Sequence, residues 1–471
     1  MKAAYILLLI CMFPGLAQAD ADQAARFGSL SPNGQAPAKA QKLVLDKYFQ
    51  SQEEAQLIPL AASQPIIEQP IGLLPADHSG PLSFEQLLQA AYAHHPLIRR
   101  SMFDQMVAKT DITVAKQAYY PTPNVSVNIG EHGRQVLSAG LTQPLYTFGK
   151  LSTGVNQAQV RESIATLAID ETRQSVALSL VNLWRNYLAA ALQITVFQNT
   201  LDRYEEYHAM ILRRFEGGRS SQADITFVES RISQTESDLK ATEARRNTTL
   251  SQLSQVTGLM LNSQSLRIPD LPSQDNQNLS TTIAQSLYFS PLLKRTQAEV
   301  EQAEVDAARA RANMLPNVNL NLQMDRYANG VDINGFNRPN EQRLMLNMQY
   351  TPGAGLSSYY QYESVAQRIA GRQAAVDAAR QDINNAVTAQ KIDLDQGFAQ
   401  FESIAASVNS NREVLNSYGR QFAVGQRTWI DLLNAARDLS GTELSQANLQ
   451  ANINAADRAV KIYRGELQLT N

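Results

Sequence analysis

The sequence contains two similar stretches about 207 positions apart, FEGGRSSQADIT at residues 215–226 and FAVGQRTWIDLL at residues 422–433. A phenylalanine, a glycine and an aspartate occupy matching positions in the two stretches. Each stretch follows a very long helical pattern, is interrupted by glycine, and is followed by the start of a second helix. A match at a fixed interval indicates an internal duplication. The chain is therefore expected to form two similar helical hairpins, with tips at about 215–224 and 422–431.

Apolar residues before each tip recur in alternating steps of four and three, which is the spacing of a helix packed along a coiled-coil seam. This seam runs from Val176 to Phe215 in the first half and from Leu394 to Phe422 in the second. At a rise of 1.5 Å per residue, each of the two longer helices extends about 100 Å. The predicted helix pairs cover about residues 150–214 with 221–257, and 356–421 with 428–467.

Residues 1–19 contain one lysine, an apolar core and a small-x-small end, which is the pattern of a secretory signal peptide cleaved before Asp20. The alternative is a lipoprotein signal that uses Cys11, but the residue before this cysteine is too large for the usual lipid-attachment pattern. Residues 20–80 are rich in Pro, Gln, Ala and Ser, and they predict an extended N-terminal segment in the periplasm.

The composition argues against several classes of function. Cys11 is the only cysteine, so the mature chain has no thiol for a disulfide or a thiolate metal site. The formal net charge of -3 offers no basic face for nucleic acid. His94 and His95 have no partner at metal-ligand spacing, and no nucleophile elbow, phosphate loop or zinc signature occurs. We therefore expect no catalytic residues, no metal and no cofactor, and the protein is not expected to be an enzyme.

Two segments in each half change from a helical period to a period of two, which predicts amphipathic strands. One alternating run follows PNV at Pro123 and another follows PNV at Pro316, and a second run comes after a loop in each case. The predicted β-hairpins cover about 123–146 and 316–351. The residues expected on a lipid-facing side are Val125, Val127, Val318, Leu320, Leu322, Leu344 and Leu346.

Alternation alone is more common in soluble sheets that rest one face on a core. However, no stretch of about 18 apolar residues is available for a spanning helix, whereas strands of roughly nine residues bounded by tyrosine and proline fit a tilted membrane strand. Four strands do not close a barrel, and an open edge in lipid leaves backbone groups unsatisfied. The pattern therefore predicts an oligomer whose chains share one barrel.

These features resemble the TolC family of trimeric outer-membrane channel-tunnels. The resemblance extends from about Leu82 to Leu467 and rests on the repeat, HHPLI and SPLLK, the two PNV strand starts, QPLYTFGK and VGQRTWIDLLNA. It implies an α+β membrane protein, with structural repeats at 81–270 and 271–471. Each chain of a homotrimer would contribute four strands to a twelve-stranded barrel in the outer membrane of a Gram-negative bacterium. Its helices would form a tunnel in the periplasm.

The resemblance also assigns partners and roles to the tips. A periplasmic adaptor and an inner-membrane transporter, ABC or proton-driven, would dock there. An Asp224 to Arg427 link corresponds to the family's latch, and Phe422 replaces a tyrosine often found beside it. Asp431 and Asn434 correspond to an acidic constriction of the lumen, in which the amide removes one ring of charge. The residues that correspond to the hairpin turns and adaptor contacts are Gly217, Gly218, Arg219 and Gly425.

Alternatives remain open for the aspartates and for the function. Asp224 and Asp431 each lie just after a turn, where an acid also caps a new helix. The leading function is export of protein by type I secretion, with an adhesin-like cargo, and the alternative is efflux of drugs or metabolites. A periplasmic coiled-coil adaptor or scaffold is an alternative of another class. It is disfavoured because each of the two hairpins follows amphipathic strands.

Overall fold

The computed structural model divides into residues 1–70 and residues 71–471, and all described residues belong to the second unit. The predicted signal peptide, the Cys11 alternative and most of the N-terminal segment lie outside the described residues. The described residues are 74–75, 80–130, 135–275, 277–327, 330–332, 334, 336–351 and 354–467.

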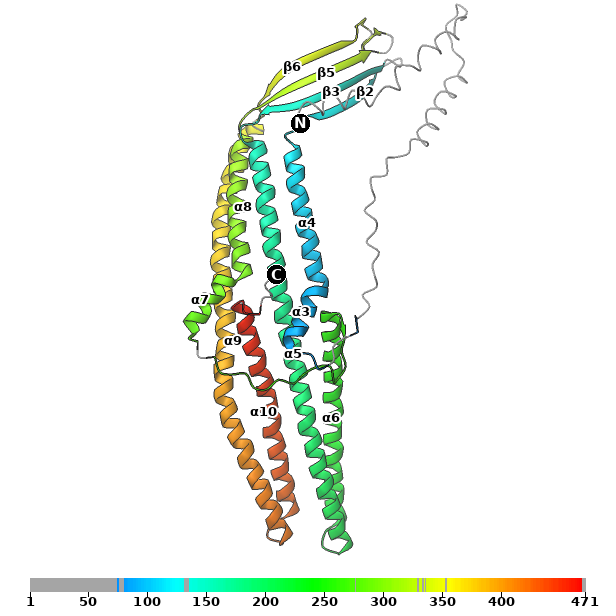
Figure 1. Cartoon of the computed structure of the whole chain (residues 1–471), viewed down its shortest axis with the longest axis vertical. Coiled ribbons are helices and arrows are strands. Elements are labelled where there is room, and N and C mark those ends of the chain that lie inside the picture. Colours follow the sequence, from blue (N-terminus) through cyan, green and yellow to red (C-terminus); the bar gives the residue numbers. More distant parts are fainter. Residues whose placement is uncertain are drawn as a thin grey trace, which may run out of the picture. The chain divides into compact units, whose positions relative to one another are not determined.

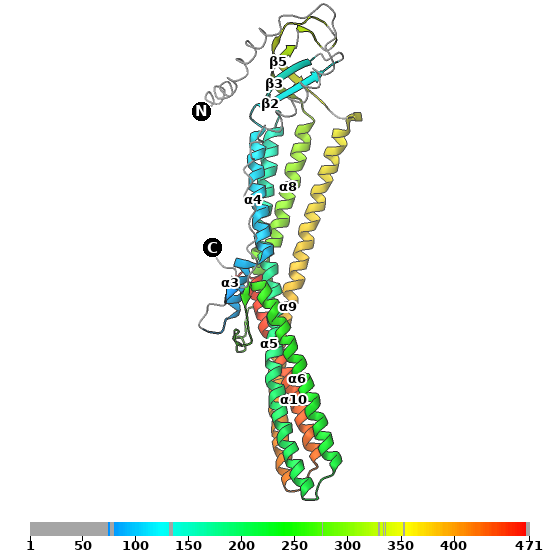
Figure 2. The same cartoon turned by 90° about the vertical axis from the view of Figure 1, so that its right-hand side faces the viewer.

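Two helices of 67 residues each, α5 (Lys150–Glu216) and α9 (Ser357–Ala423), run the length of the helical part from the sheet to the tips (Figures 1 and 2). From the tips the chain returns in α6 (Gln222–Thr257) and α10 (Trp429–Tyr463). Helix α6 packs on α5, whereas α10 packs on both α9 and α5. These four helices confirm the predicted helix pairs to within about four residues at each end.

Four shorter helices accompany the halves of α5 and α9 nearest the sheet: α3 (Phe84–His94), α4 (Pro96–Gln117), α7 (Leu279–Phe289) and α8 (Pro291–Asn313). Proline at the first position starts both α4 and α8, where its missing N–H has no helical partner in any case. Helix α4 packs along α5, and α8 packs against both α5 and α9. In this region α8 thus takes the place that α10 has nearer the tips.

Two glycines mark where the returning helices meet the short ones. Gly258 follows α6 with φ 72°, and a Cβ built on it would lie 3.0 Å from the Cβ of His94 at the end of α3. Gly465 follows α10 with φ 78°, and its Cβ would lie 3.0 Å from the ring of Phe289 at the end of α7. Only glycine combines this left-handed backbone with so close an approach. The ends of α6 and α10 therefore abut the ends of α3 and α7.

A four-stranded antiparallel sheet has the order β2-β3-β5-β6. Its strands are β2 (Thr122–Ile129), β3 (Gln135–Tyr146), β5 (Asn317–Tyr327) and β6 (Glu341–Gln349). Each half of the chain contributes one hairpin, and the β3–β5 ladder joins the halves. Both predicted hairpins are confirmed, and β2 and β6 are the outer strands of the four within the chain.

The helices bury two main apolar cores. One lies where α3, α5, α6 and α10 meet, and there the rings of Phe84 and Trp184 are 5.9 Å apart. The other lies near the tips and contains residues from both hairpins, among them Ile211, Val228 and Leu439. Fully burying each such side chain contributes about 1.5–3 kcal/mol, so the two hairpins are packed as one body near their tips.

The segment between the halves is held by buried cations. It begins after β4 (Leu259–Met260), which pairs in parallel with β1 (Leu74–Pro75). The side chain of Lys391 is only 3% exposed, and its Nζ donates to the backbone oxygen of Asp275 at 3.0 Å. Arg464 Nη1 donates to Oδ2 of Asp275 at 2.6 Å. The connecting segment is thereby attached to both α9 and α10.

In the part of the chain that the structure describes, no helix combines the length and the apolar character needed to cross a membrane.

Candidate functional site: the hairpin tips and the sheet

The two tips turn in the same way. Gly218 and Gly425 have φ values of 71° and 81°, and a built Cβ would have no neighbour within 4 Å at either position. The N–H of Arg219 donates to the oxygen of Arg214 at 2.8 Å, and the matching bond in the second tip is 2.9 Å long. Glycine is thus required by the left-handed backbone that ends a helix in this motif. Gly217 has an ordinary φ of -83°.

Both tip aspartates cap the helix that follows the turn. Ser221 N–H donates to Asp224 Oδ2 at 2.8 Å, which forms a capping box at the start of α6. At the start of α10, the hydroxyl of Thr428 donates to Asp431 Oδ2 at 2.8 Å and its backbone N–H donates at 3.1 Å. These hydrogen bonds, and chiefly the one from the Thr428 hydroxyl, hold the pKa of Asp431 below its ordinary value. The capping role considered for both residues is therefore present.

The tips are joined to each other within one chain. Trp429 Nε1 donates to Asp224 Oδ1 at 2.9 Å, and the indole packs edge-on against Phe227 with ring centroids 5.4 Å apart. From the opposite direction, Arg214 Nη2 donates to the backbone oxygen of Phe422 at 2.9 Å. The guanidinium of Arg214 also lies 3.9 Å above the Phe422 ring. Each hairpin thus contributes one donor to the other.

Asp224 and Arg427 are not paired within the described residues of a single chain. Arg427 Nε donates to Gln421 Oε1 at 3.3 Å, and its guanidinium lies 4.5 Å from the centre of the Tyr418 ring. Arg427 is itself exposed at the tip, as is Arg219. Phe422, which the resemblance placed beside the latch, is only 2% exposed and belongs to the apolar core near the tips.

Asp431 and Asn434 share one face of α10 because they are three residues apart. Asp431 is half-buried and Asn434 is exposed.

Sequence reasoning missed the two donors that join the tips, Trp429 and Arg214. An indole in an otherwise polar turn is a usable signal, since a tryptophan there has an N–H that seeks an acceptor.

The ladder register sorts the sheet into an apolar face and a polar face. Leu320 is opposite Leu346, and Leu322 is opposite Leu344. Through β3, the same face continues to Val125 on β2. The apolar residues on this face are Pro123, Val125, Val127, Ile129, Leu137, Ala139, Leu141, Val318, Leu320, Leu322, Met324, Leu344, Leu346 and Met348.

All seven residues predicted to face lipid lie on this apolar face, and those on the outer strands are the most exposed, with Val125 at 72% and Leu346 at 68%. On the opposite face Asp325 is 5% exposed. It accepts hydrogen bonds from Ser138 at 2.6 Å and from Gln323 at 3.0 Å, and it pairs with Arg343. A sheet with one solvated face and one exposed apolar face needs an apolar environment on the second.

The matched sequence family decides the identity. Residues 87–259 and 282–466, which include most of both halves, match the family described as outer membrane efflux protein. The chain belongs to the outer membrane efflux protein family. This membership confirms the resemblance to the TolC family, and it agrees with a channel rather than an enzyme. The protein is located in the outer membrane, with its helical tunnel in the periplasm.

Several known proteins are similar to this chain over most of their own length. The outer membrane efflux protein BepC of Brucella suis is 22% identical over 411 residues, which cover 81% of this chain and 84% of BepC. The proteases secretion protein PrtF of Dickeya chrysanthemi is 22% identical over 339 residues, covering 69% and 72%. The crystal structure of the outer membrane protein VceC of Vibrio cholerae superposes with a TM-score of 0.69 at 14% identity, covering 81% of this chain and 96% of VceC. The chain therefore has the fold of an outer-membrane channel.

Proposed function

We propose that the protein is the outer-membrane channel of a tripartite export machine and that it works as a homotrimer. The observation that carries this proposal is the sheet, which has one apolar face, one polar face and two outer strands, β2 and β6, with no further partner in the four-stranded order. Three copies would close the sheet into one barrel, with lipid outside and water inside. Closure removes unsatisfied edge groups, each of which costs several kcal/mol in lipid.

The trimer can be tested by placing charge on each face of one strand. Leu346→Arg puts a cation on the apolar face, where an arginine costs about 2–4 kcal/mol at the middle of a membrane. The matched control is Asn347→Arg on the polar face of the same strand. We expect Leu346→Arg to deplete the heat-modifiable trimer in the outer-membrane fraction and Asn347→Arg to leave it. Equal trimer levels in the two variants, or recovery of the parent protein as a soluble periplasmic monomer, would contradict the proposal.

At the tips, we propose that Arg427 of one chain pairs with Asp224 of its neighbour when the tunnel is closed. The exposed guanidinium supports this proposal, because its present contacts, Gln421 and Tyr418, leave it at the surface. One such exposed pair contributes about a kilocalorie or less, so adaptor binding is sufficient to open it. Asp431 and Asn434 would face the lumen below, and the glycine turns with Arg219 would contact the periplasmic adaptor.

For the cargo, we propose protein export by type I secretion, driven by an ABC transporter, with an adhesin-like cargo as the specific case. The similarity to a proteases secretion protein supports protein cargo. The second candidate is efflux of drugs or metabolites by an ABC or proton-driven pump, which the similarity to the efflux protein BepC favours. The same tunnel could work with a type I secretion transporter or with an efflux pump.

The deciding experiment compares a deletion strain with its parent, and with a strain that carries the gene back on a plasmid. The secreted proteins are identified by mass spectrometry, and growth is measured in a panel of toxic compounds. Loss of one large secreted protein with unchanged tolerance is the expected result. Normal secretion with lowered tolerance would assign the channel to efflux instead.

A further inference from the structure

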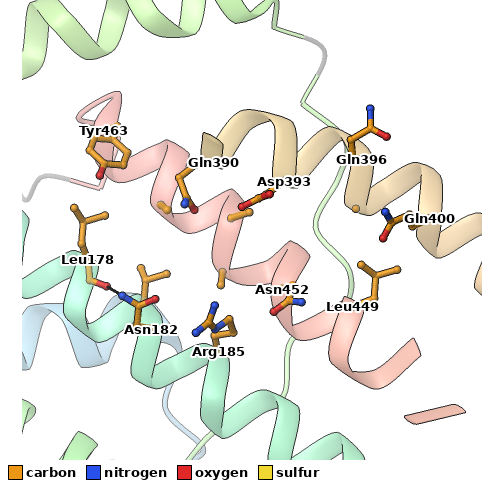
Figure 3. Close-up of a pocket in the computed structure, with 15 residues that line it drawn as sticks. Leu178, Asn182, Arg185, Gln390, Asp393, Gln396, Gln400, Leu449, Asn452 and Tyr463 are labelled. Carbon is orange, nitrogen blue, oxygen red and sulfur yellow. Dashed lines mark hydrogen bonds between the residues drawn. The ribbon is translucent and has the colours of Figure 1, made fainter. Parts of the chain in front are cut away.

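A groove with polar walls lies where α5, α9 and α10 meet (Figure 3). Its volume is about 540 Å³, which is within the range of ligand sites. The α5 wall carries Asn182 and Arg185, and Asn452 of α10 lies between the walls. The polar residues of the α9 wall are Gln390, Asp393, Gln396 and Gln400.

The floor of the groove is made of small residues. Ala455, Ala456 and Ala459 of α10 are buried and leave room between the walls. Gly397 of α9 lets the two helices approach closely, because a Cβ built there would lie 2.7 Å from Cγ1 of Ile453. The groove therefore results from the packing of small residues and is not a gap between loosely packed helices.

The polar side chains of this groove have unused hydrogen-bonding capacity. Within the described residues, Arg185 and Asp393 form no ion pair, and Gln390 and Asn452 form no side-chain hydrogen bond. Asn182 donates only to a backbone oxygen of its own helix. The groove thus presents several amides and one charge of each sign that have no partners among the described residues.

Nearer the tips, α5 and α10 are joined by polar groups that pair directly with each other. Gln193 donates to Asn448 at 2.6 Å, and Arg203 of α5 pairs with Glu443 of α10 at 2.8 Å. The contrast shows that polar residues between α5 and α10 pair directly where the helices are close. In the groove they are separated, so they are available to a ligand.

From this geometry we infer that the groove binds the backbone of an unfolded polypeptide as it passes through the channel. This inference rests on the proposed function. Side-chain amides both donate and accept hydrogen bonds, as the peptide group does. A drug-like ligand favours walls that are predominantly apolar and aromatic, whereas seven of the 15 lining residues here carry amide or charged side chains. The opposite charges of Arg185 and Asp393 cancel, so the groove does not select for ions of one sign.

The position of the groove agrees with this inference. The connecting segment between the halves packs on the α9 and α10 face that carries Leu394, Ile453 and Val460, where Leu271 joins their apolar cluster. Leu449 and Ala456 belong both to this cluster and to the lining of the groove, whereas the polar groove residues Gln390, Asp393 and Asn452 lie outside the cluster. In the proposed trimer these polar residues would face the lumen, and the groove would occur once per chain.

The test uses the purified full-length trimer in planar bilayers. The probe is an unfolded, uncharged peptide of glycine and serine, and polyethylene glycol of the same hydrodynamic radius is the comparison. The test variant replaces three groove amides by leucine (Asn182→Leu, Gln390→Leu, Asn452→Leu). The control keeps amides at the same sites (Asn182→Gln, Gln390→Asn, Asn452→Gln). We expect the leucine variant to shorten peptide blockades at least fivefold, the effect of losing about one hydrogen bond. The amide-swapped control is expected to keep most of the blockade time, and events from polyethylene glycol should not change.

A second measurement covers the case in which the triple variant does not assemble. Asn452→Cys places a thiol in the groove, and the only other cysteine lies in the predicted signal peptide. We expect the glycine-serine peptide, but not polyethylene glycol, to slow modification of this thiol.

The outcomes separate the inference from the proposed function. If the trimer conducts but peptide blockades are equal in parent and leucine variant, the groove does not bind polypeptide. Protection of the thiol by a malto-oligosaccharide and not by the peptide would assign the groove to sugars and overturn the inference. A protein that forms neither trimers nor conducting pores would overturn the proposed function itself.

Discussion

The indole nitrogen of Trp429 lies 2.9 Å from Oδ1 of Asp224, and this hydrogen bond joins two hairpin tips across 205 positions of sequence. Asp224 at the same time caps α6 through Ser221. The carboxylate therefore has one oxygen for its own helix and one for the other hairpin. A movement of one hairpin that opens or closes the tunnel therefore has to break this bond or move both tips together.

Trp429→Phe is expected to loosen the tips while leaving the cap of α6 in place. Phenylalanine keeps the ring contact with Phe227 but has no N–H for Asp224. A hydrogen bond to a carboxylate at a partly exposed site contributes about 1–2 kcal/mol, so the open state should become several-fold more populated. Single-channel conductance in planar bilayers checks this. The matched control is Phe227→Leu, which keeps the indole bond and should conduct like the parent. Equal conductance in Trp429→Phe and the parent would remove this bond from the closure of the tip.

The cap of α10 is expected to be lost in acid, and to be lost at a higher pH when Thr428 is replaced by valine. The pKa of Asp431 is lowered chiefly by the Thr428 hydroxyl. A lowered pKa means that the cap is fully present above the ordinary value of about 3.9 and is lost as the pH falls through the lower value in the folded protein. Without the hydroxyl, the loss shifts to higher pH. Hydrogen exchange of residues 428–431, corrected for the intrinsic pH dependence, measures both. The same pH dependence in parent and variant would contradict this account.

The sequence predicted the helices and strands because their causes are local. Periods of 3.6 and 2, prolines at helix starts and glycines after the tips each act over a few residues. The end of β3 at Tyr146 matches the predicted end of the first hairpin. The strand reaches it because its ladder with β5 resumes after an irregularity at Pro144.

The contacts across the tips and the groove were not predictable in the same way. The duplication matches Trp429 with Gln222, so the symmetry of the repeat hides the one indole that makes the contact. The latch residues were assigned by resemblance, and a single chain does not bring Asp224 and Arg427 together. The groove depends on which polar residues lack partners, and a seam pattern reports only the apolar positions.

Asp275→Asn is expected to make stability less sensitive to acid. Burial favours the neutral acid, but the Gln277 backbone N–H and the charges of Arg464 and Lys391 outweigh it and lower the pKa of Asp275. Its stabilising contribution is therefore present above about pH 4 and lost as the pH falls through the lowered pKa. At neutral pH the asparagine variant should be less stable by about 1–3 kcal/mol, because Arg464 loses one of its two charged partners and keeps only Glu466. The temperature at which the trimer dissociates on gels, followed from pH 7 to pH 3, should converge for parent and variant. Curves that stay parallel would refute the role of the Asp275 charge.

Gly397→Ala is expected to destabilise the packing of α9 on α10, although alanine favours a helix. The added Cβ would lie 2.7 Å from Cγ1 of Ile453, which is fully buried and has no free space to move into. Overpacking of this kind costs about 1–3 kcal/mol, which outweighs a gain in helix propensity of about 1 kcal/mol. Gly371→Ala in the same helix is the control, since its Cβ would meet no described residue within 4 Å. The trimer dissociation temperature should fall for Gly397→Ala and stay or rise for Gly371→Ala. A gain in stability in both variants would contradict the prediction, because it would show that α9 and α10 are not packed so closely at Ile453 that the added Cβ is excluded.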